Sequence, residues 1–365
     1  MTAAASMDNT DVRSALVDLI ARAYLSPESE LGTVTAGELR ANYFSFGMPI
    51  EASHQGRSRR VFVKVPKDDL RRRGPDVLPL SDRDRQLGDE EYRSLVFLAE
   101  HWPGADLGVS FVRPFGFLDM YNAIVTDRVE ARDGCALLRR WDLARRSGHA
   151  TSRRRIRDIM ARLGQALRRF HDRFTDERPF DGPRLAAKLR RYAAELAGRT
   201  RQRSLLDRVR AAADRIACAD LPGRETWTLK GIDIRNVFVG EDDRIVILDP
   251  GKMKRAVAEA DLARFLVTYR ILWWGSPLFL LGLRPDPEGE TAFLRAYYGE
   301  PDRDGLLLHA QFVKELLKHW HTAHDSLSLK LWSGAAKRML GSAVVDSYYT
   351  RQLRRELDWL DRIKR

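Results

Sequence analysis

The chain has 365 residues, which is enough for one large domain or for two intimate lobes with a sizeable core. A hydrophobic fraction of 44% excludes an intrinsically disordered chain, and two cysteines alone form neither a metal site nor a disulfide scaffold. The formal net charge of +12 fits a nucleic acid, an anionic membrane surface or a phosphorylated or acidic substrate, but also arginines that only solvate helix faces, as in Arg71–Arg73. Because no zinc-finger spacing, RNP-like strand or compact helix-turn-helix signature accompanies the charge, we do not expect nucleic acid as a partner.

The sequence carries no signal for export or for a membrane span. Residues 1–10 are small and polar, without the basic start and apolar run of a signal peptide. The longest uncharged apolar stretch, Ile271–Leu283, is too short to cross a bilayer as a helix. We therefore expect a cytoplasmic protein, with peripheral contact at an anionic inner membrane surface or with a lipid-linked substrate as a further option.

The first third of the chain alternates helical and strand-like patterns. Helical spacing of apolar residues predicts helices over residues 11–24 and 89–101. Strands are predicted over residues 43–50, 60–65, 109–118 and 122–129. The charged segment 68–88, which contains proline and glycine, reads as a loop or an insertion.

The rest of the chain is mainly helical. Long basic amphipathic helices are predicted over residues 136–146, 153–173, 183–197 and 202–218. Two short strand-like stretches, 235–239 and 244–248, interrupt them, and the helical tail 306–365 carries no functional pattern. This order excludes a continuous parallel sheet of βαβ units and predicts an α+β fold. Its predicted parts are an N-terminal helical extension (1–39), a small β-rich lobe (40–130) and a larger helical lobe with an embedded hairpin (131–365).

The hairpin between Asn236 and Asp249 carries the strongest chemical pattern. In NVFVGEDDRIVILD, two short hydrophobic strands flank an acidic turn, with an amide at the start and a carboxylate at the end. Such a hairpin brings its ends to one edge, and amide and carboxylate oxygens suit Mg²⁺ bound together with nucleotide phosphates. An ordinary turn asparagine and strand-end aspartate are the alternative interpretation, and the spacing to Asp261 favours the metal site.

The segment NVFVGEDDRIVILDPG, together with the later EADLARFL, resembles the metal-binding hairpin and following helix start of aminoglycoside phosphotransferases and choline kinases, a branch of the protein-kinase-like superfamily. The resemblance implies a bilobal kinase-like fold, with Asn236 and Asp249 as Mg²⁺ ligands and Asp261 as a structural carboxylate. It implies ATP and Mg²⁺ as cofactors. The implied reaction moves the γ-phosphate to a hydroxyl of a small-molecule, glycan or lipid-linked acceptor.

Two upstream residues resemble the nucleotide-binding pair of kinases. Lys64 ends an alternating strand and Glu91 lies on the next predicted helix, so they resemble the strand lysine and the helix glutamate that orients it. Glu90 is the alternative partner, because the helix phase is not fixed to one residue. The chain lacks a GxGxxG loop, for which Phe46–Gly47 and His54–Gly56 are only loose substitutes.

The sequence LKGIDIRN, which ends at Asn236, departs from the family pattern HGDxxxxN. Gly231 stands at the position of the catalytic aspartate and Leu229 at that of the histidine. Three outcomes remain open. Asp233 acts as the base from a shortened loop, Lys230 contributes charge to the transferred phosphoryl group, or the chain is a pseudokinase that binds nucleotide as a regulator or scaffold.

Two further features bear on the acceptor, and His171 is a separate case. Ile271–Leu283 lies where the family builds its acceptor pocket, and is either a buried helix pair or a surface for a membrane or lipid-linked acceptor. Lys252, Lys254 and Arg255 either meet an anionic acceptor or decorate a loop. His171, at the end of a predicted helix, is interpreted as a packing or capping residue.

Overall fold

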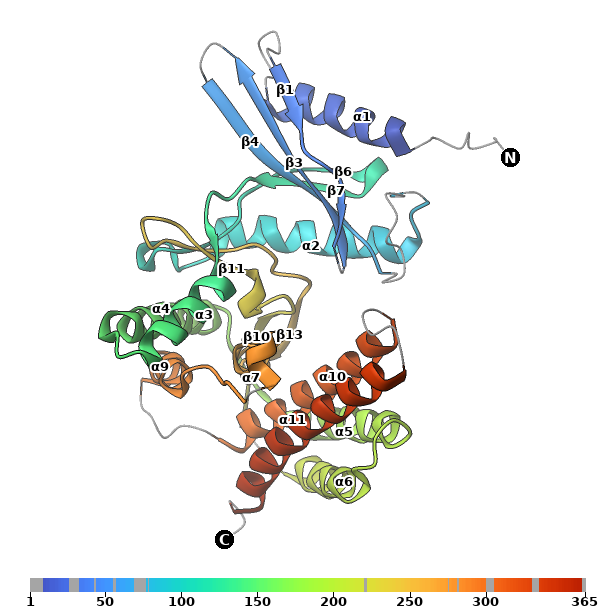
Figure 1. Cartoon of the computed structure of the whole chain (residues 1–365), viewed down its shortest axis with the longest axis vertical. Helices are drawn as coiled ribbons and strands as arrows, with labels where there is room; N and C mark the ends of the chain where they lie inside the picture. Colours follow the sequence, from blue (N-terminus) through green and yellow to red (C-terminus); the bar gives the residue numbers. More distant parts are fainter. Residues whose placement is uncertain are drawn as a thin grey trace. The chain divides into compact units, whose positions relative to one another are not determined.

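The computed structural model describes residues 9–25, 33–42, 44–54, 57–68, 77, 79–219, 222–274, 276–280, 282–299, 305–329 and 335–362. Of the positions discussed above, Arg71–Arg73, Gln55, Gly56, Gly275 and Leu281 lie outside these residues. The chain divides into two compact units (Figure 1). Unit 1 comprises Met1–Trp102, Ser110–Ala131 and Val239–Met253. Unit 2 comprises Pro103–Val109, Arg132–Phe238 and Lys254–Arg365.

Unit 1 is built on an antiparallel sheet whose strand order is β1-β3-β4-β7-β6, with β2 also paired to β3. The strands are β1 (Thr33–Ala36), β2 (Arg40–Ala41), β3 (Ser45–His54), β4 (Arg57–Pro66), β6 (Pro114–Leu118) and β7 (Ala123–Asp127). Lys64, on the central strand β4, lies opposite Gly47 of β3 and Ile124 of β7. The strands predicted over residues 43–50, 60–65 and 122–129 are confirmed with shifted bounds, whereas the stretch 109–118 forms two strands, β5 (Val109–Phe111) and β6, in different sheets.

Two helices cover opposite faces of this sheet (Figure 1). They are α1 (Asn9–Ile20), continued by the π-helical turn η1 (Ala21–Leu25), and α2 (Asp82–His101). Every second residue of β4, from Val61 onward, packs with Leu16 of α1. The residues between them point to the other face, where Ile124 packs against Leu95 of α2. Lys64 therefore faces α2.

The prediction of a loop over residues 68–88 is wrong from Asp82 onward, because α2 begins seven residues earlier than expected. Ser81 caps the helix with its Oγ accepting the N–H of Asp84 at 3.0 Å, and Asp84 Oδ2 accepts the N–H of Ser81 at 3.0 Å. A serine followed three residues later by an acidic residue is the pattern of this capping box, so the sequence did contain the signal.

Unit 2 is mainly helical. Its helices are α3 (Gly134–Arg146), α4 (Ala150–Arg173), α5 (Gly182–Ala197), α6 (Arg203–Cys218), α7 (Glu259–Arg270), α8 (Pro277–Leu280), α9 (Pro287–Tyr298), α10 (Leu306–Leu329) and α11 (Ala335–Arg362), with the 3-10 turn η2 (Ala105–Leu107). The four basic helices predicted from periodicity are confirmed to within three residues. Helix α10 packs against α5, α7 and α11 (Figure 1). Across the described ranges, none of the helices has the length and hydropathy that a bilayer-spanning segment requires.

Unit 2 also contains a small sheet, β13 (Met253–Val257), β10 (Pro222–Leu229) and β9 (Asp176–Pro179), which periodicity did not predict. Strand β10 leads into the 3-10 turn η4 (Ile234–Asn236), which replaces the start of the strand predicted over 235–239. Of the short elements that remain in the chain, η3 (Asp119–Tyr121) and β12 (Ile245–Ile247) belong to unit 1 and β8 (Arg132–Asp133) to unit 2, while β5 (Val109–Phe111) and β11 (Val237–Val239) each have residues in both units.

The described residues of the apolar stretch from Ile271 do not form a helix pair, since among them only the four-residue α8 follows α7. Leu272 and Trp273 are each 2% exposed, and Phe279 of α8 is also buried. The indole Nε1 of Trp273 donates to Asp142 Oδ2 at 3.1 Å. These residues pack inside unit 2, which favours a buried role over a membrane-facing one.

Candidate active site

Three of the residues singled out from the sequence meet in unit 1. Lys64 Nζ lies 2.6 Å from Glu91 Oε1 and 2.7 Å from Asp249 Oδ2. The sheet, helix α2 and the end of β12 each supply one of the three side chains. Lys64 faces α2, and Glu91 lies on the side of that helix that contacts Lys64. Lys64 thus bridges two carboxylates that are 27 and 185 residues away in the chain.

The electrostatics of this trio leave an excess of negative charge. Burial lowers the pKa of Lys64, but the charges of Asp249 and Glu91 outweigh burial and raise that pKa above its ordinary value. Burial, and then the charge of Asp249, raise the pKa of Glu91, against the opposing effect of Lys64. One ammonium group cannot neutralise two carboxylates, so the trio is suited to a further cation.

Helix α2 distinguishes Glu91 from Glu90. Glu90 Oε1 does not contact Lys64 but accepts hydrogen bonds from Gln86 Nε2 at 3.0 Å and from Lys252 Nζ. Ser94, one turn later, accepts the N–H of Met253 through its Oγ at 3.2 Å. Lys252, which the sequence offered as an acceptor contact, is therefore engaged with α2 inside unit 1.

Asp249 has the chemistry and exposure that a magnesium ligand needs. Its Oδ1 accepts the N–H of Gly251 at 2.7 Å, and its side chain is 32% exposed. Gly251 has φ of +58°, a conformation that glycine adopts without steric cost, which allows this tight Asp-Pro-Gly turn. Within the described residues, no group of three His, Cys, Asp or Glu side chains could hold a metal by itself. A magnesium ion at Asp249 would complete its coordination with other oxygen ligands, as Mg²⁺ commonly does with water and substrate phosphates.

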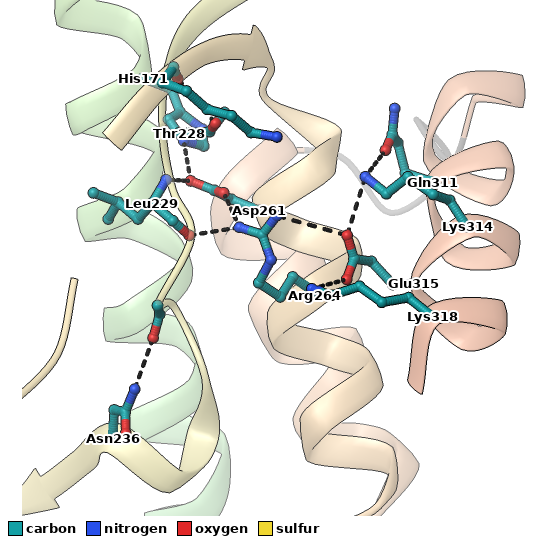
Figure 2. Close-up of polar contacts among 12 residues, drawn as sticks. His171, Thr228, Leu229, Asn236, Asp261, Arg264, Gln311, Lys314, Glu315 and Lys318 are labelled. Carbon is teal, nitrogen blue, oxygen red and sulfur yellow. Dashed lines mark hydrogen bonds and ion pairs between the residues drawn. The ribbon is translucent and has the colours of Figure 1, made fainter. Parts of the chain in front are cut away.

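In unit 2, Asp261 anchors the start of the loop that precedes Asn236 (Figure 2). Asp261 is fully buried, and its Oδ2 accepts the N–H of Leu229 at 2.7 Å. Its Oδ1 lies 3.1 Å from Arg264 Nη1, which also donates to Leu229 O at 2.6 Å. His171 Nε2 lies 3.3 Å from Asp261 Oδ2, while its Nδ1 contacts Tyr297 Oη at 2.8 Å. His171 is thus a buried packing residue.

Two of the loop's own side chains, Asn236 and Asp233, make hydrogen bonds within it. Asn236 Nδ2 donates to Gly231 O at 2.9 Å (Figure 2). Asp233 is 8% exposed, and its Oδ1 accepts from the backbone N–H of Arg235 at 2.9 Å and from Arg235 Nε at 2.8 Å. Arg235 Nη2 donates to Asp233 Oδ2. Lys230 is exposed.

The pKa of Asp233 follows from this pairing. Burial raises it, but the hydrogen bonds and charge of Arg235 outweigh burial and bring it below its ordinary value. Both carboxylate oxygens are therefore held by one guanidinium. The sequence reasoning did not include Arg235, although an Asp-x-Arg spacing in a tight turn could have suggested the pair. It also did not include Arg264, which lies one turn after Asp261 on α7.

A family model described as "phosphotransferase enzyme family" matches residues 56–307. No curated protein sequence matches significantly. The chain is similar to the structure of a choline/ethanolamine kinase family protein from Mesorhizobium loti, at 14% identity over 96% of this chain and 99% of that one, with a TM-score of 0.52. An ethanolamine kinase from Plasmodium vivax gives a TM-score of 0.54 at 9% identity, over 96% of this chain and 92% of that one.

A spectinomycin phosphotransferase in complex with ADP and spectinomycin gives a TM-score of 0.52 at 15% identity, over 93% of this chain and 98% of that one. At such identities the likeness establishes the fold. The predicted α+β fold of the protein-kinase-like class is therefore confirmed. The roles predicted for Lys64, Glu91, Asn236 and Asp249 stay predictions.

Proposed function

The chain belongs to the phosphotransferase enzyme family, and we propose that it transfers the γ-phosphate of ATP to a hydroxyl group of an acceptor. The resemblance to aminoglycoside phosphotransferases and choline kinases, and the assignment to an enzyme family of the kinase type, are both confirmed by this membership. The reaction of this particular chain, its acceptor and its site residues belong to the proposal.

The contact of Lys64 with Glu91 is the observation that carries the proposal. An ammonium group held 2.6 Å from a buried glutamate keeps one position, from which it can bind the α- and β-phosphates of a nucleotide. The same ammonium lies 2.7 Å from Asp249, the predicted magnesium ligand. The nucleotide phosphates and the magnesium ion would therefore bind next to each other. A lysine that only decorated the surface would not be shared by two carboxylates.

Magnesium would supply charge neutralisation for the transferred phosphoryl group. Asp249 would hold it through a carboxylate that is partly exposed and already oriented by Gly251. The role of Asn236 as a second ligand rests on the sequence pattern. The hydrogen bond from Asn236 to Gly231 supports that role only by fixing the amide plane.

The names of similar proteins indicate only the general class of the acceptor. One neighbour holds ADP and spectinomycin, and another is named as an ethanolamine kinase. These names support a nucleotide together with a small hydroxylated molecule as the substrates of this chain. Nothing in the packing of Leu272 and Trp273 favours a membrane-bound acceptor.

The loop chemistry is where this chain differs from its family. Phosphoryl transfer passes through a largely dissociative transition state, so positioning and electrostatics contribute more than a strong base. Lys230, which is exposed in the loop, could supply charge there. Asp233 remains the candidate base, and its pairing with Arg235 makes its carboxylate a weaker base.

The pairing of Asp233 with Arg235 favours a second function. With Gly231 at the family's aspartate position and Asp233 paired to Arg235, the chain would bind a nucleotide without transferring phosphate. Such a pseudokinase would act as a regulator or a scaffold. It would retain the contacts of Lys64 with Glu91 and Asp249.

The deciding experiment measures ADP release with ATP, Mg²⁺ and a panel of hydroxylated acceptors, beside thermal unfolding with ATP and Mg²⁺. We expect Asp249→Asn to abolish turnover and the Mg²⁺-dependent rise in unfolding temperature. Asp242→Asn, in the exposed turn of the same hairpin, is the matched control and should retain both. Nucleotide stabilisation without turnover supports the pseudokinase. Absence of both nucleotide binding and turnover in the wild type would refute the proposal.

A further inference from the structure

Three cations lie around one buried carboxylate on α10 (Figure 2). Glu315 of α10 is 1% exposed. Its Oε1 lies 3.0 Å from Lys314 Nζ and 3.6 Å from Arg264 Nη2, and its Oε2 lies 3.3 Å from Lys318 Nζ. Lys314 donates in addition to Gln311 Oε1. Glu315 is thus more than neutralised by its own neighbours.

Two more lysines extend this group. Lys254 on β13 and Lys188 on α5 both lie close enough to Glu315 for its charge to act on their pKa, and the charge of Lys188 acts on the pKa of Lys254. Among the residues that the structure describes, neither forms a hydrogen bond or an ion pair through its ammonium group. Together with Arg264, Lys314 and Lys318 they form what we call the basic cluster.

The basic cluster carries more positive charge than the carboxylates beside it can balance. Four ammonium groups and one guanidinium lie around Glu315. Arg264 also pairs with Asp261, which accepts the Leu229 N–H as well, and Asp181 is the other carboxylate near Lys188. Burial, followed by the charges of Arg264 and Lys314, lowers the pKa of Lys254 to about 8. Burial also lowers the pKa of Lys314, against the pull of Glu315. Buried lysines that repel one another are relieved either by the loss of a proton or by an anion that binds among them.

The cluster adjoins the loop that ends at Asn236. Arg264 donates to Leu229 O at 2.6 Å, and Thr228 Oγ1 donates to Lys254 O at 3.0 Å, so β10 leads directly from the cluster into the loop. On α10, His319 follows Lys318 and lies close enough to Asp233 to influence its pKa. An anion held by the cluster would therefore lie beside the loop where the family places its reacting hydroxyl.

The geometry points to an anionic acceptor: we propose that the basic cluster binds the phosphate group of a phosphorylated, hydroxylated small molecule. This inference rests on the proposed function, because it describes the acceptor of that reaction. Lysine suits the role, since its ammonium is a compact charge on a flexible stem that can approach a phosphate from several sides. A cationic acceptor would be repelled by Lys188 and Lys254. Neutralisation of Glu315 is not an alternative role for these two, because Lys314, Lys318 and Arg264 already accomplish it.

The first test measures binding of inorganic phosphate to the full chain by calorimetry, at constant ionic strength with chloride as the comparison anion. We expect phosphate binding to weaken by roughly tenfold or more in Lys254→Met and in Lys188→Met, because each loses a charge-assisted contact. Arg154→Gln, which removes one positive charge from the exposed start of α4, should bind as the wild type does. Equal binding in the wild type and both lysine variants would overturn the inference.

A second readout separates ligand binding from a structural role. Without phosphate, Lys254→Met should unfold at a higher temperature than the wild type, since it removes an unbalanced charge. With phosphate, the wild type should gain unfolding temperature and the variant should not. A variant that is less stable in both conditions would show that Lys254 supports the fold instead, and would count against the proposal.

The third arm identifies the source of the phosphate group and tests the proposed function separately. Glycerol 3-phosphate is compared with glycerol, and with vesicles that contain phosphatidate in phosphatidylcholine. We expect competition with inorganic phosphate by the soluble ester, and none by glycerol. Competition by the vesicles alone would overturn the choice of a small molecule. Phosphate binding that depends on Lys254, without ADP release from any acceptor, would refute the proposed transfer and leave the anion site standing.

Discussion

The carboxylate of Asp261 accepts the backbone N–H of Leu229 at 2.7 Å, and this bond joins α7 to the start of the loop that ends at Asn236. Arg264 completes the link by donating to Leu229 O at 2.6 Å, so both backbone groups of Leu229 are held from α7. Loop residues of a transfer site must keep their positions to within fractions of an ångström. The pair therefore accounts for how an atypical loop sequence retains a defined shape.

Replacement of Asp261 should be strongly destabilising. Asp261→Ala leaves the buried guanidinium of Arg264 without its nearest carboxylate and the Leu229 N–H without an acceptor, and we expect a loss of about 3–5 kcal/mol in the free energy of unfolding. Urea denaturation followed by circular dichroism measures it. Asp172→Ala is the control: this aspartate is 48% exposed, and its loss should cost about 0–1 kcal/mol. A small effect at Asp261 would show that the loop is held by other contacts.

Glu91 and Glu90 should respond differently to the same substitution. Glu91→Gln removes the charge that fixes Lys64, so we expect weaker binding of ATP with Mg²⁺ by roughly tenfold. Glu90→Gln loses only the contact with Lys252 and should bind ATP as the wild type does. Fluorescence titration with a nucleotide analogue measures both. Equal losses in the two variants would remove Glu91 from the nucleotide site.

Much of unit 1 could be predicted because it depends on local patterns. Alternation along β4 requires Lys64 to point away from the core of Val61 and its alternate neighbours. Helical spacing on α2 then places a glutamate opposite it. What the sequence left open was which glutamate, since Glu90 and Glu91 differ by only 100° around the helix. Only the packing of α2 on the sheet distinguishes them.

The basic cluster could not be predicted, because its members come from four distant elements. Lys188, Lys254 and Lys318 lie on α5, β13 and α10, and no periodicity in the sequence relates them. The helical tail from residue 306 carried no functional pattern for the same reason. Similarly, the pairing of Asp233 with Arg235 depends on the backbone of the turn η4, where a strand was expected. Local pattern predicts which elements form, and tertiary packing decides which charges meet.

The two cysteines should differ in reactivity. Cys135 is 8% exposed, and burial raises the pKa of its thiol to about 12, so very little thiolate is present at neutral pH. Cys218, at the end of α6, is exposed. Titration with a disulfide reagent at pH 8 should modify one thiol quickly in the native chain and the second only in denaturant. The Cys218→Ser variant should show no fast modification, and fast modification in that variant would contradict the buried placement of Cys135.

Anion binding should depend on pH through Lys254. Its pKa in the folded chain is about 8, below the ordinary 10.5, so binding should weaken as the pH rises through about 8 and the ammonium loses its proton. Among the groups that act on Lys254, the charges of Arg264, Lys314 and Lys188 lower its pKa, and the charge of Glu315 raises it. Sulfate is the suitable probe, because its own charge is constant across this range. Calorimetry at pH 7 and pH 9 measures the change, which should be smaller in Lys254→Met.

The same shift fixes the sign of a stability effect. Between about pH 8 and pH 10.5 the unfolded chain binds a proton at Lys254 that the folded chain does not. The contribution of Lys254 to the free energy of unfolding therefore becomes more favourable as the pH rises through this window. Lys254→Met should lose that contribution to the pH dependence. An identical slope in both proteins would show that Lys254 has an ordinary pKa.

The pairing of Asp233 with Arg235 makes the role of the loop carboxylate testable. Arg235 keeps the pKa of Asp233 below its ordinary value, so Arg235→Gln should raise it toward that value. If Asp233 accepts the proton of the acceptor hydroxyl, the acidic limb of the curve of ADP release against pH should move to higher pH in this variant. Arg244→Gln, in the exposed turn of the hairpin, should leave the limb in place. An acidic limb that is the same in Arg235→Gln and the wild type would identify Asp233 as a residue that shapes the turn, and would leave charge neutralisation as the catalytic contribution of this loop.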